Sequence, residues 1–214
     1  MLPEELDCPF NQISFYIHEK LFGKTGVSIL KDITHVMDCE CFQIDGERIS
    51  REVSIFDLRT LSYEVLHCFA EDFCCYYEMS ERNKYAVRRQ RRIHGLYFYN
   101  NRVKKNFLSQ KELFCYLKKS YYEKDFLFGY KGGDIESSLC KEMKIPSLNM
   151  EHLGVEKYEF LLNHFNVNLL TCNQHASHFI SHCSLYEVLL FGGRICERIC
   201  DLEKLEKILE LYKK

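Results

Sequence analysis

A short segment near the end of the chain, residues 172–188, concentrates side chains that can bind metal ions. Its sequence, CNQHASHFISHCSLYEV, holds two cysteines and three histidines in seventeen residues. Cys172, His175 and Cys183 are separated by two and then seven residues. Thiolate and imidazole groups are preferred zinc ligands, and a closed structural site needs a fourth ligand. The segment therefore predicts three ligands of a zinc site.

The same segment carries a base and an acid with different chemistry. His182 and Glu187 lie just over one helical turn apart. Far upstream, Asp38 and Glu40 are two residues apart in an apolar run, so in a strand both would project from one face. Converging carboxylates repel one another unless a divalent cation binds between them, and oxygen ligands suit Mg²⁺ or Mn²⁺. Two such ions can support the hydrolysis of a phosphodiester.

A further acid is expected from the glycine-rich junction KGGDIESSLC, residues 131–140. Asp134 and Glu136 open a helix there, just after a buried strand, and the carboxyl ends of strands usually host ligands. Both acids are candidates for the catalytic site. Glu136 is also a candidate for the fourth zinc ligand.

The elements that must position these residues are strands and helices in alternation. Three strand-like runs, at 33–42, 52–58 and 63–69, have short connections and predict an antiparallel meander. An amphipathic helix at 109–122, a buried strand at 126–130, further helices and a last short strand at 167–170 follow. This order predicts a single α/β domain whose mixed sheet joins the meander to parallel strands, with helices on its flanks.

Composition limits the functional classes. The 214 residues are 46% hydrophobic and 28% charged, with a formal net charge of −2, so any surface for nucleic acid must be local. No apolar run is long enough to span a bilayer, and the polar first twenty residues do not form a signal peptide. Twelve cysteines in such a chain predict an intracellular, reducing location, cytoplasmic or nuclear.

One local basic surface stands out. Residues 71–93 change from acidic and aromatic to basic, and four arginines lie close together: Arg88, Arg89, Arg91 and Arg92. Arginines with aromatic neighbours predict a surface that contacts the phosphates of single-stranded RNA or DNA. A solvated helix face is the alternative.

Taken together, the acidic motifs resemble those of the DEDDh-type 3′→5′ exonucleases, which have an RNase H-like fold. DCE at 38–40, an acid after FLFGYKGG, and HCSLYEV at 182–188 match that family's Asp-x-Glu, second Asp and His-x4-Asp motifs in order. The resemblance implies two divalent metals, Mg²⁺ or Mn²⁺, a general base at His182, and metal-binding acids at Asp38, Glu40, Asp134 and Glu187. Glu187 stands where the family has Asp, and KGGD replaces the family's usual approach to its second acid.

The cysteine and histidine pattern resembles a second family, the Maelstrom domain, a relative of the same exonuclease fold in germline small-RNA pathways. That domain carries a Glu-Cys-His-Cys zinc set. The resemblance implies a structural zinc at Cys172, His175 and Cys183, with Glu136 as the acid, which leaves Asp134 to the catalytic site. In the Maelstrom family the zinc set accompanies loss of the exonuclease acids, whereas this chain carries both sets.

These inferences combine into one hypothesis and one alternative. The hypothesis is a metal-dependent nuclease of the 3′→5′ exonuclease type, acting on single-stranded nucleic acid and containing a structural zinc. Its expected parts are an N-terminal extension with a strand (1–30), the RNase H-like domain (31–192) and a C-terminal amphipathic helix (193–214). The alternative is a catalytically inactive, Maelstrom-like RNA-binding module of small-RNA or transposon biology.

Overall fold

The structure of the chain is a computed structural model. It describes residues 24, 26–121, 126–132, 134–168, 170, 172, 174, 175 and 182–213. Most of the N-terminal extension predicted at 1–30 therefore lies outside the described residues.

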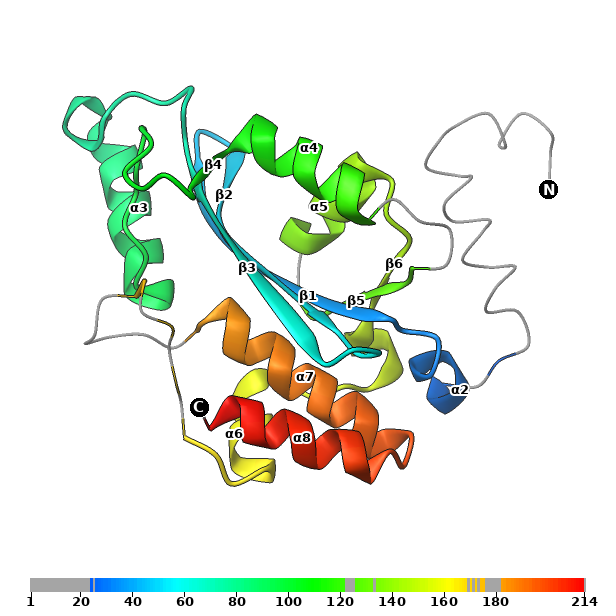
Figure 1. The fold of residues 1–214 in the computed structure, drawn as a ribbon. Coiled ribbons are helices and arrows are strands. Elements are labelled where there is room, and N and C mark those ends of the chain that lie inside the picture. The colour runs from blue at the N-terminus through cyan, green and yellow to red at the C-terminus, as the bar shows by residue number, and fades with distance from the viewer. Residues whose placement is uncertain are drawn as a thin grey trace.

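Strands form a mixed sheet in the order β4-β3-β2-β1-β5-β6 (Figure 1). Their bounds are β1 His35–Ile44, β2 Glu47–Asp57, β3 Ser62–Phe69, β4 Leu108–Ser109, β5 Phe128–Tyr130 and β6 Ser147–Asn149. β1, β2 and β3 form the antiparallel meander, while β5 runs parallel to β1 and β6 parallel to β5. The prediction of a mixed α/β sheet that joins a meander to parallel strands is confirmed.

One element of that prediction is wrong. The run at 167–170 does not supply the last parallel strand, because Val167, Asn168 and Leu170 lie outside any strand. β6 takes that place instead. It follows the helix α5 (Asp134–Met143), which carries the chain from the end of β5 back to the edge of the sheet. A crossover through a helix is the usual way to bring the next strand into parallel register.

Helices cover both faces of the sheet (Figure 1). α4 and α5 lie on one face and α7 lies on the other, where α6 and α8 back it. Among the described residues, no helix has both the length and the apolar character that a bilayer crossing requires. The helix bounds are α2 Gly26–Leu30, α3 Glu81–His94, α4 Gln110–Tyr121, α5 Asp134–Met143, α6 Tyr158–His164, α7 Ser184–Arg198 and α8 Leu202–Tyr212, with short 3₁₀ turns η2 Tyr76–Glu78 and η3 Met150–Leu153.

Alternation along β1 sets which side chains meet which helices. Val36 packs in the hydrophobic cluster around α7, whereas Met37 and Cys39 pack in the cluster around α4 and α5. Successive side chains in a strand point to opposite faces. Asp38 and Glu40 therefore share the face of Val36, which α7 covers.

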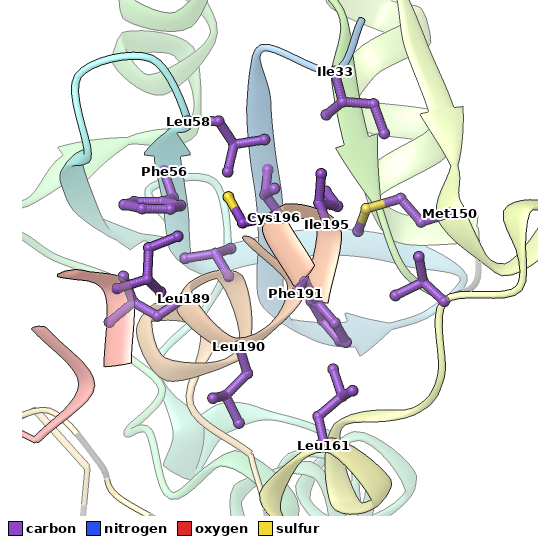
Figure 2. Close-up of a cluster of buried hydrophobic side chains, with 14 of the residues drawn as sticks. Ile33, Phe56, Leu58, Met150, Leu161, Leu189, Leu190, Phe191, Ile195 and Cys196 are labelled. Atoms are coloured by element: carbon purple, nitrogen blue, oxygen red, sulfur yellow. The ribbon is translucent and has the colours of Figure 1, made fainter. Parts of the chain in front are cut away.

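The largest hydrophobic cluster surrounds α7. Figure 2 shows Phe191 and Ile195 of this helix among Phe56 of β2, Met150 and Leu161. Phe56, Met150, Leu161, Phe191 and Ile195 are each at most 1% exposed. This helix, which begins at Ser184, is thus held firmly against the sheet, and so is its first turn.

Two adjacent glycines of α7 provide a matched test of this packing. A Cβ on Gly192 would lie 2.7 Å from Cε1 of Phe56, whereas a Cβ on Gly193 would lie 3.4 Å from Cδ1 of Leu205. We expect Gly192→Ala to lower the free energy of unfolding by about 1–3 kcal/mol, because the helix must move off the sheet. Gly193→Ala is expected to raise it by up to about 1 kcal/mol, since alanine favours the helix. Urea unfolding measures both, and equal effects would contradict this packing.

Candidate metal and catalytic centre

Four carboxylates and one histidine gather around β1, where α7 and the first turn of α5 approach this strand. Metal-binding atoms of Glu40, His182 and Glu187 all lie within 4.8 Å of one another. Asp38 completes the pair on β1 and is 6% exposed, and Glu136, from the first turn of α5, is 5% exposed. The negative charges of Glu187, Glu136 and Glu40 act on Asp38, as expected for one cluster.

The four buried or half-buried carboxyl groups would repel one another strongly if all of them were ionised without a cation between them. Burial, reinforced by the neighbouring carboxylates, raises the pKa of Asp38 well above its ordinary value. Burial and the charge of Glu187 likewise raise the pKa of Glu40 to about 8. For Glu136, burial raises the pKa to about 7. A bound divalent cation would relieve this repulsion, so the residues fit the oxygen-rich site expected for Mg²⁺ or Mn²⁺.

His182 lies at the edge of this cluster, just before α7. Its Nδ1 is 2.5 Å from Oε1 of Glu187, and its side chain is 30% exposed. The hydrogen bond with Glu187 raises the pKa of His182 to about 8. The imidazole is therefore oriented by a carboxylate and accessible to solvent. This is the arrangement of a general base, although the same geometry also makes His182 a possible metal ligand.

Asp134 and Glu136 lie on opposite sides of the first turn of α5. The side chain of Asp134 is 88% exposed, and its Oδ2 is 3.4 Å from Nη2 of Arg48. Glu136 instead points into the protein, where its carboxylate receives a backbone hydrogen bond from Cys39. The structure thus places Glu136 among the other carboxylates and leaves Asp134 outside both clusters, in contrast to the prediction that assigned Glu136 to zinc and Asp134 to the catalytic site.

A second cluster contains three of the four predicted zinc ligands and a different acid. Metal-binding atoms of Cys172, His175, Cys183 and Glu52 all lie within 4.8 Å of one another. Oε1 of Glu52 is 3.2 Å from Nε2 of His175, and Oε2 is 3.4 Å from Sγ of Cys172. In a tetrahedral zinc site, whose bonds to the metal are about 2.0–2.3 Å long, neighbouring ligand atoms lie at distances from one another close to these two contact distances. Glu52, from β2, occupies the position that sequence reasoning gave to Glu136.

This second cluster contains two groups, Cys172 and Glu52, whose anionic forms are favoured, so a cation between them would be stabilising. A hydrogen bond from Cys183 lowers the pKa of Cys172 to about 6, which favours a thiolate. Although burial raises it, the hydrogen bonds from His175 and Ser184 lower the pKa of Glu52 to about 2. Burial opposes protonation of His175, but Cys172 and Glu52 raise its pKa to about 10. Without metal, the proton on His175 would balance these anions, and zinc can replace it.

Strand register sets the two clusters side by side. Glu40 on β1 pairs directly with Glu52 on β2, and Glu52 pairs with His67 on β3. Paired residues of neighbouring strands project from the same face, so Glu40 and Glu52 are adjacent there. At the other side, His182 and Cys183 are consecutive. The cluster of Glu52, Cys172, His175 and Cys183, the zinc-type cluster, therefore lies immediately next to the carboxylate cluster.

Sequence reasoning missed Glu52. It also missed Ser184, whose Oγ donates to Oε1 of Glu52 at 2.7 Å, and His67, whose Nδ1 lies 3.3 Å from Oε2 of Glu52. One signal was available: Glu52 stands in the strand-like run EVSIFDL, on the same face as the buried Phe56. A carboxylate at an inward position needs a partner, which makes it a candidate ligand.

The four arginines of the predicted nucleic-acid surface do not form one patch. They are exposed along α3, but each helical residue is rotated by about 100° from the last. Arg88 lies 3.8 Å from Glu81, and the guanidinium of Arg91 lies 3.9 Å from the ring centre of Tyr97. Arg89 faces a groove instead. The surface is thus divided around the helix.

Comparisons with known proteins give few matches. No family model matches the sequence, and no curated protein matches it. Among solved structures, the Mopeia virus exonuclease domain partially complexed with manganese has a TM-score of 0.45 and 13% identity, over 87% of this chain and 85% of that one. The manganese-depleted form of that domain gives a TM-score of 0.45 and 11% identity, over 88% and 86%. Because the identity and the TM-score are this low, the activity of this chain has to be inferred from its own residues.

Proposed function

We propose that this protein is a metal-dependent nuclease of the DEDDh 3′→5′ exonuclease type that acts on single-stranded RNA or DNA. The observation that carries the proposal is the convergence of Asp38 and Glu40 of β1, Glu136 of α5 and Glu187 of α7, with His182, in one cluster of interacting charges. Four buried or half-buried carboxylates are unfavourable together unless cations bind them. We therefore assign Glu136, rather than Asp134, as the second acid.

In this proposal the residues have separate tasks. Divalent ions held by the carboxylates would activate water and stabilise the leaving oxygen of a phosphodiester. His182 would accept the proton of the attacking water, and Glu187 would orient its imidazole through Nδ1. Glu187 stands where the family has the shorter Asp. Its hydrogen bond with His182 fixes the position of its carboxylate.

We further infer that Glu52, Cys172, His175 and Cys183 bind a structural zinc of the Maelstrom type. Four ligands of mixed type close a tetrahedral site without an open position. Cys183 lies immediately before α7, which carries Glu187 in its first turn. Zinc would thus anchor the start of α7 and, through it, His182. An intracellular, reducing location would keep both thiols available.

A catalytically inactive, zinc-stabilised RNA-binding module is the second candidate. One observation favours it: Glu187 and His182 hydrogen bond to each other at 2.5 Å, so a base and a metal-binding acid are mutually engaged. In this case nucleic acid would bind without being cleaved.

A nuclease assay separates the two candidates. Full-length protein is incubated with 5′-labelled single-stranded RNA or DNA in Mg²⁺, Mn²⁺ or EDTA. The exonuclease proposal expects a ladder that shortens from the 3′ end with either metal and is absent in EDTA, and that His182→Ala loses. Binding without cleavage in every metal condition would refute the exonuclease and support the binding module.

A further inference from the structure

A groove lies between α3 and the turn that joins β1 to β2. Its volume is about 580 Å³, and its lining includes Gln43, Asp45, Arg82, Tyr85, Arg89 and Ile93. Neither candidate metal cluster contributes to this lining. The groove is therefore a separate site.

The helical side of the groove combines cationic and aromatic groups. Residues 82, 85, 89 and 93 follow one face of α3, because they are three or four residues apart. Tyr85 is 65% exposed, so its ring is available for stacking. Within the described part of the chain, no ion pair involves Arg82 or Arg89, in contrast to Arg88. Their guanidinium groups remain free for an anionic ligand.

The acid in the groove is already engaged. Oδ2 of Asp45 accepts a hydrogen bond from Nδ2 of Asn83 at 2.7 Å. The backbone N–H of Gln43 donates to Oε1 of Gln90 at 3.1 Å, which ties β1 to α3. These contacts set the width of the groove and leave the two arginines as its dominant charges.

The groove lies beyond the carboxylate cluster along β1. Gln43 is three residues beyond Glu40 on β1, which corresponds to about 10 Å of strand. The far end of α3 also approaches the zinc-type cluster, where Nδ1 of His175 contacts the backbone oxygen of His94. α3 thus extends from the metal clusters to the groove, and an extended ligand could contact both.

We propose that this groove binds a single-stranded nucleic acid whose 3′ end lies at the carboxylates. Arg82 and Arg89 contact backbone phosphates, and Tyr85 stacks on a base. Free arginines next to an exposed tyrosine match the way in which single strands are bound without sequence preference. The assignment rests on the proposed nuclease function, and it selects the groove side of α3 over the other arginines.

The test is fluorescence anisotropy with a labelled single-stranded oligonucleotide and no added Mg²⁺ or Mn²⁺. Full-length protein with Asp38→Asn is used, so that cleavage cannot interfere and no chelator is needed. Arg82→Gln with Arg89→Gln is expected to weaken binding about tenfold and to reduce the slope of log K against log salt by about 1.4, which is about 0.7 for each lost phosphate contact. Tyr85→Ala is expected to weaken binding at least about fivefold, and Tyr85→Phe should restore it.

The matched control removes the same charge from another side of the same helix. Arg88→Gln with Arg91→Gln is expected to change affinity less than about threefold, because these side chains lie about 60° and 120° around the helix from Tyr85, the nearest of the four groove residues. Equal losses in both double variants would overturn the groove assignment. So would displacement of the oligonucleotide by polyglutamate as efficiently as by unlabelled oligonucleotide, since that indicates a general anion site.

A chromogenic nucleotide ester separates this inference from the nuclease proposal. Such a substrate is too short to reach the groove, so the groove variants should cleave it as the wild type does. If the wild type cleaves nothing but the groove variants still lose binding, the groove assignment stands and the nuclease proposal fails. If the wild type cleaves the ester and the groove variants bind the oligonucleotide normally, the nuclease proposal stands and the groove assignment fails.

Discussion

Replacing Glu136 with glutamine is expected to reduce metal-dependent cleavage by at least about a hundredfold, whereas Asp134→Asn should leave it nearly unchanged. The two acids are two residues apart on α5, but only Glu136 is buried among the other carboxylates. Asp134 is exposed and paired with Arg48. In the proposed site, loss of Glu136 would remove one oxygen ligand of the divalent metals, whereas loss of Asp134 would remove only a surface contact with Arg48.

Two further measurements keep this comparison interpretable. Manganese binding by calorimetry should weaken in Glu136→Gln and persist in Asp134→Asn, whether or not a substrate has been found. The melting temperature of Glu136→Gln should equal or exceed that of the wild type, because a buried, repelled carboxylate is neutralised. A variant pair with the opposite ranking, active for Glu136→Gln and inactive for Asp134→Asn, would restore the assignment made from sequence.

Loss of the zinc-type cluster is expected to have the largest effect on stability. Purified protein should contain about one zinc per chain, and Cys183→Ser or Glu52→Gln should abolish that content. We expect each variant to lower the free energy of unfolding by about 3–5 kcal/mol, since the remaining buried charges lose their cation. Metal analysis and thermal melts with and without a strong chelator measure both quantities.

The chain offers two matched controls for this prediction. Cys196 lies on the same helix, α7, and is 1% exposed but belongs to the hydrophobic cluster, so Cys196→Ala should keep its zinc. Glu136→Gln should also keep its zinc, which distinguishes Glu52 from Glu136 as the fourth ligand. Zinc-free protein whose melting temperature no chelator alters would refute the site.

The two clusters are expected to be coupled, and the coupling free energy is the same in both directions. Zinc would hold Cys183, and His182 and the first turn of α7 are joined to Cys183 by the chain itself. Glu40 and Glu52 are also direct neighbours across β1 and β2. Removing zinc should therefore disturb the carboxylate cluster and weaken its binding of divalent metals, whereas removing the divalent metals should lower the zinc affinity by the same factor without releasing a tightly bound zinc.

The sequence by itself determined the features that depend on local periodicity. Three strand-like runs with short connections predicted β1, β2 and β3 because a meander needs only neighbouring pairings. The two-residue spacing of Asp38 and Glu40 placed both on one face of β1. Cys172, His175 and Cys183 were identified because zinc ligands of these types occur at short spacings.

Only the tertiary structure decided which acid belongs to which cluster. Asp134 and Glu136 are about 200° apart around α5, so just one of them can face the sheet, and the sequence does not say which. Glu52 reaches the cysteines through the pairing of β2 with its neighbours and the packing of α7 on the sheet. Such contacts join residues more than a hundred positions apart, such as Glu52 and Cys172, and no local pattern encodes them. Residues 172–188 thus contain Cys172, His175, Cys183, His182 and Glu187, while the fold brings Glu52 to the cysteines and Glu136 to the other carboxylates.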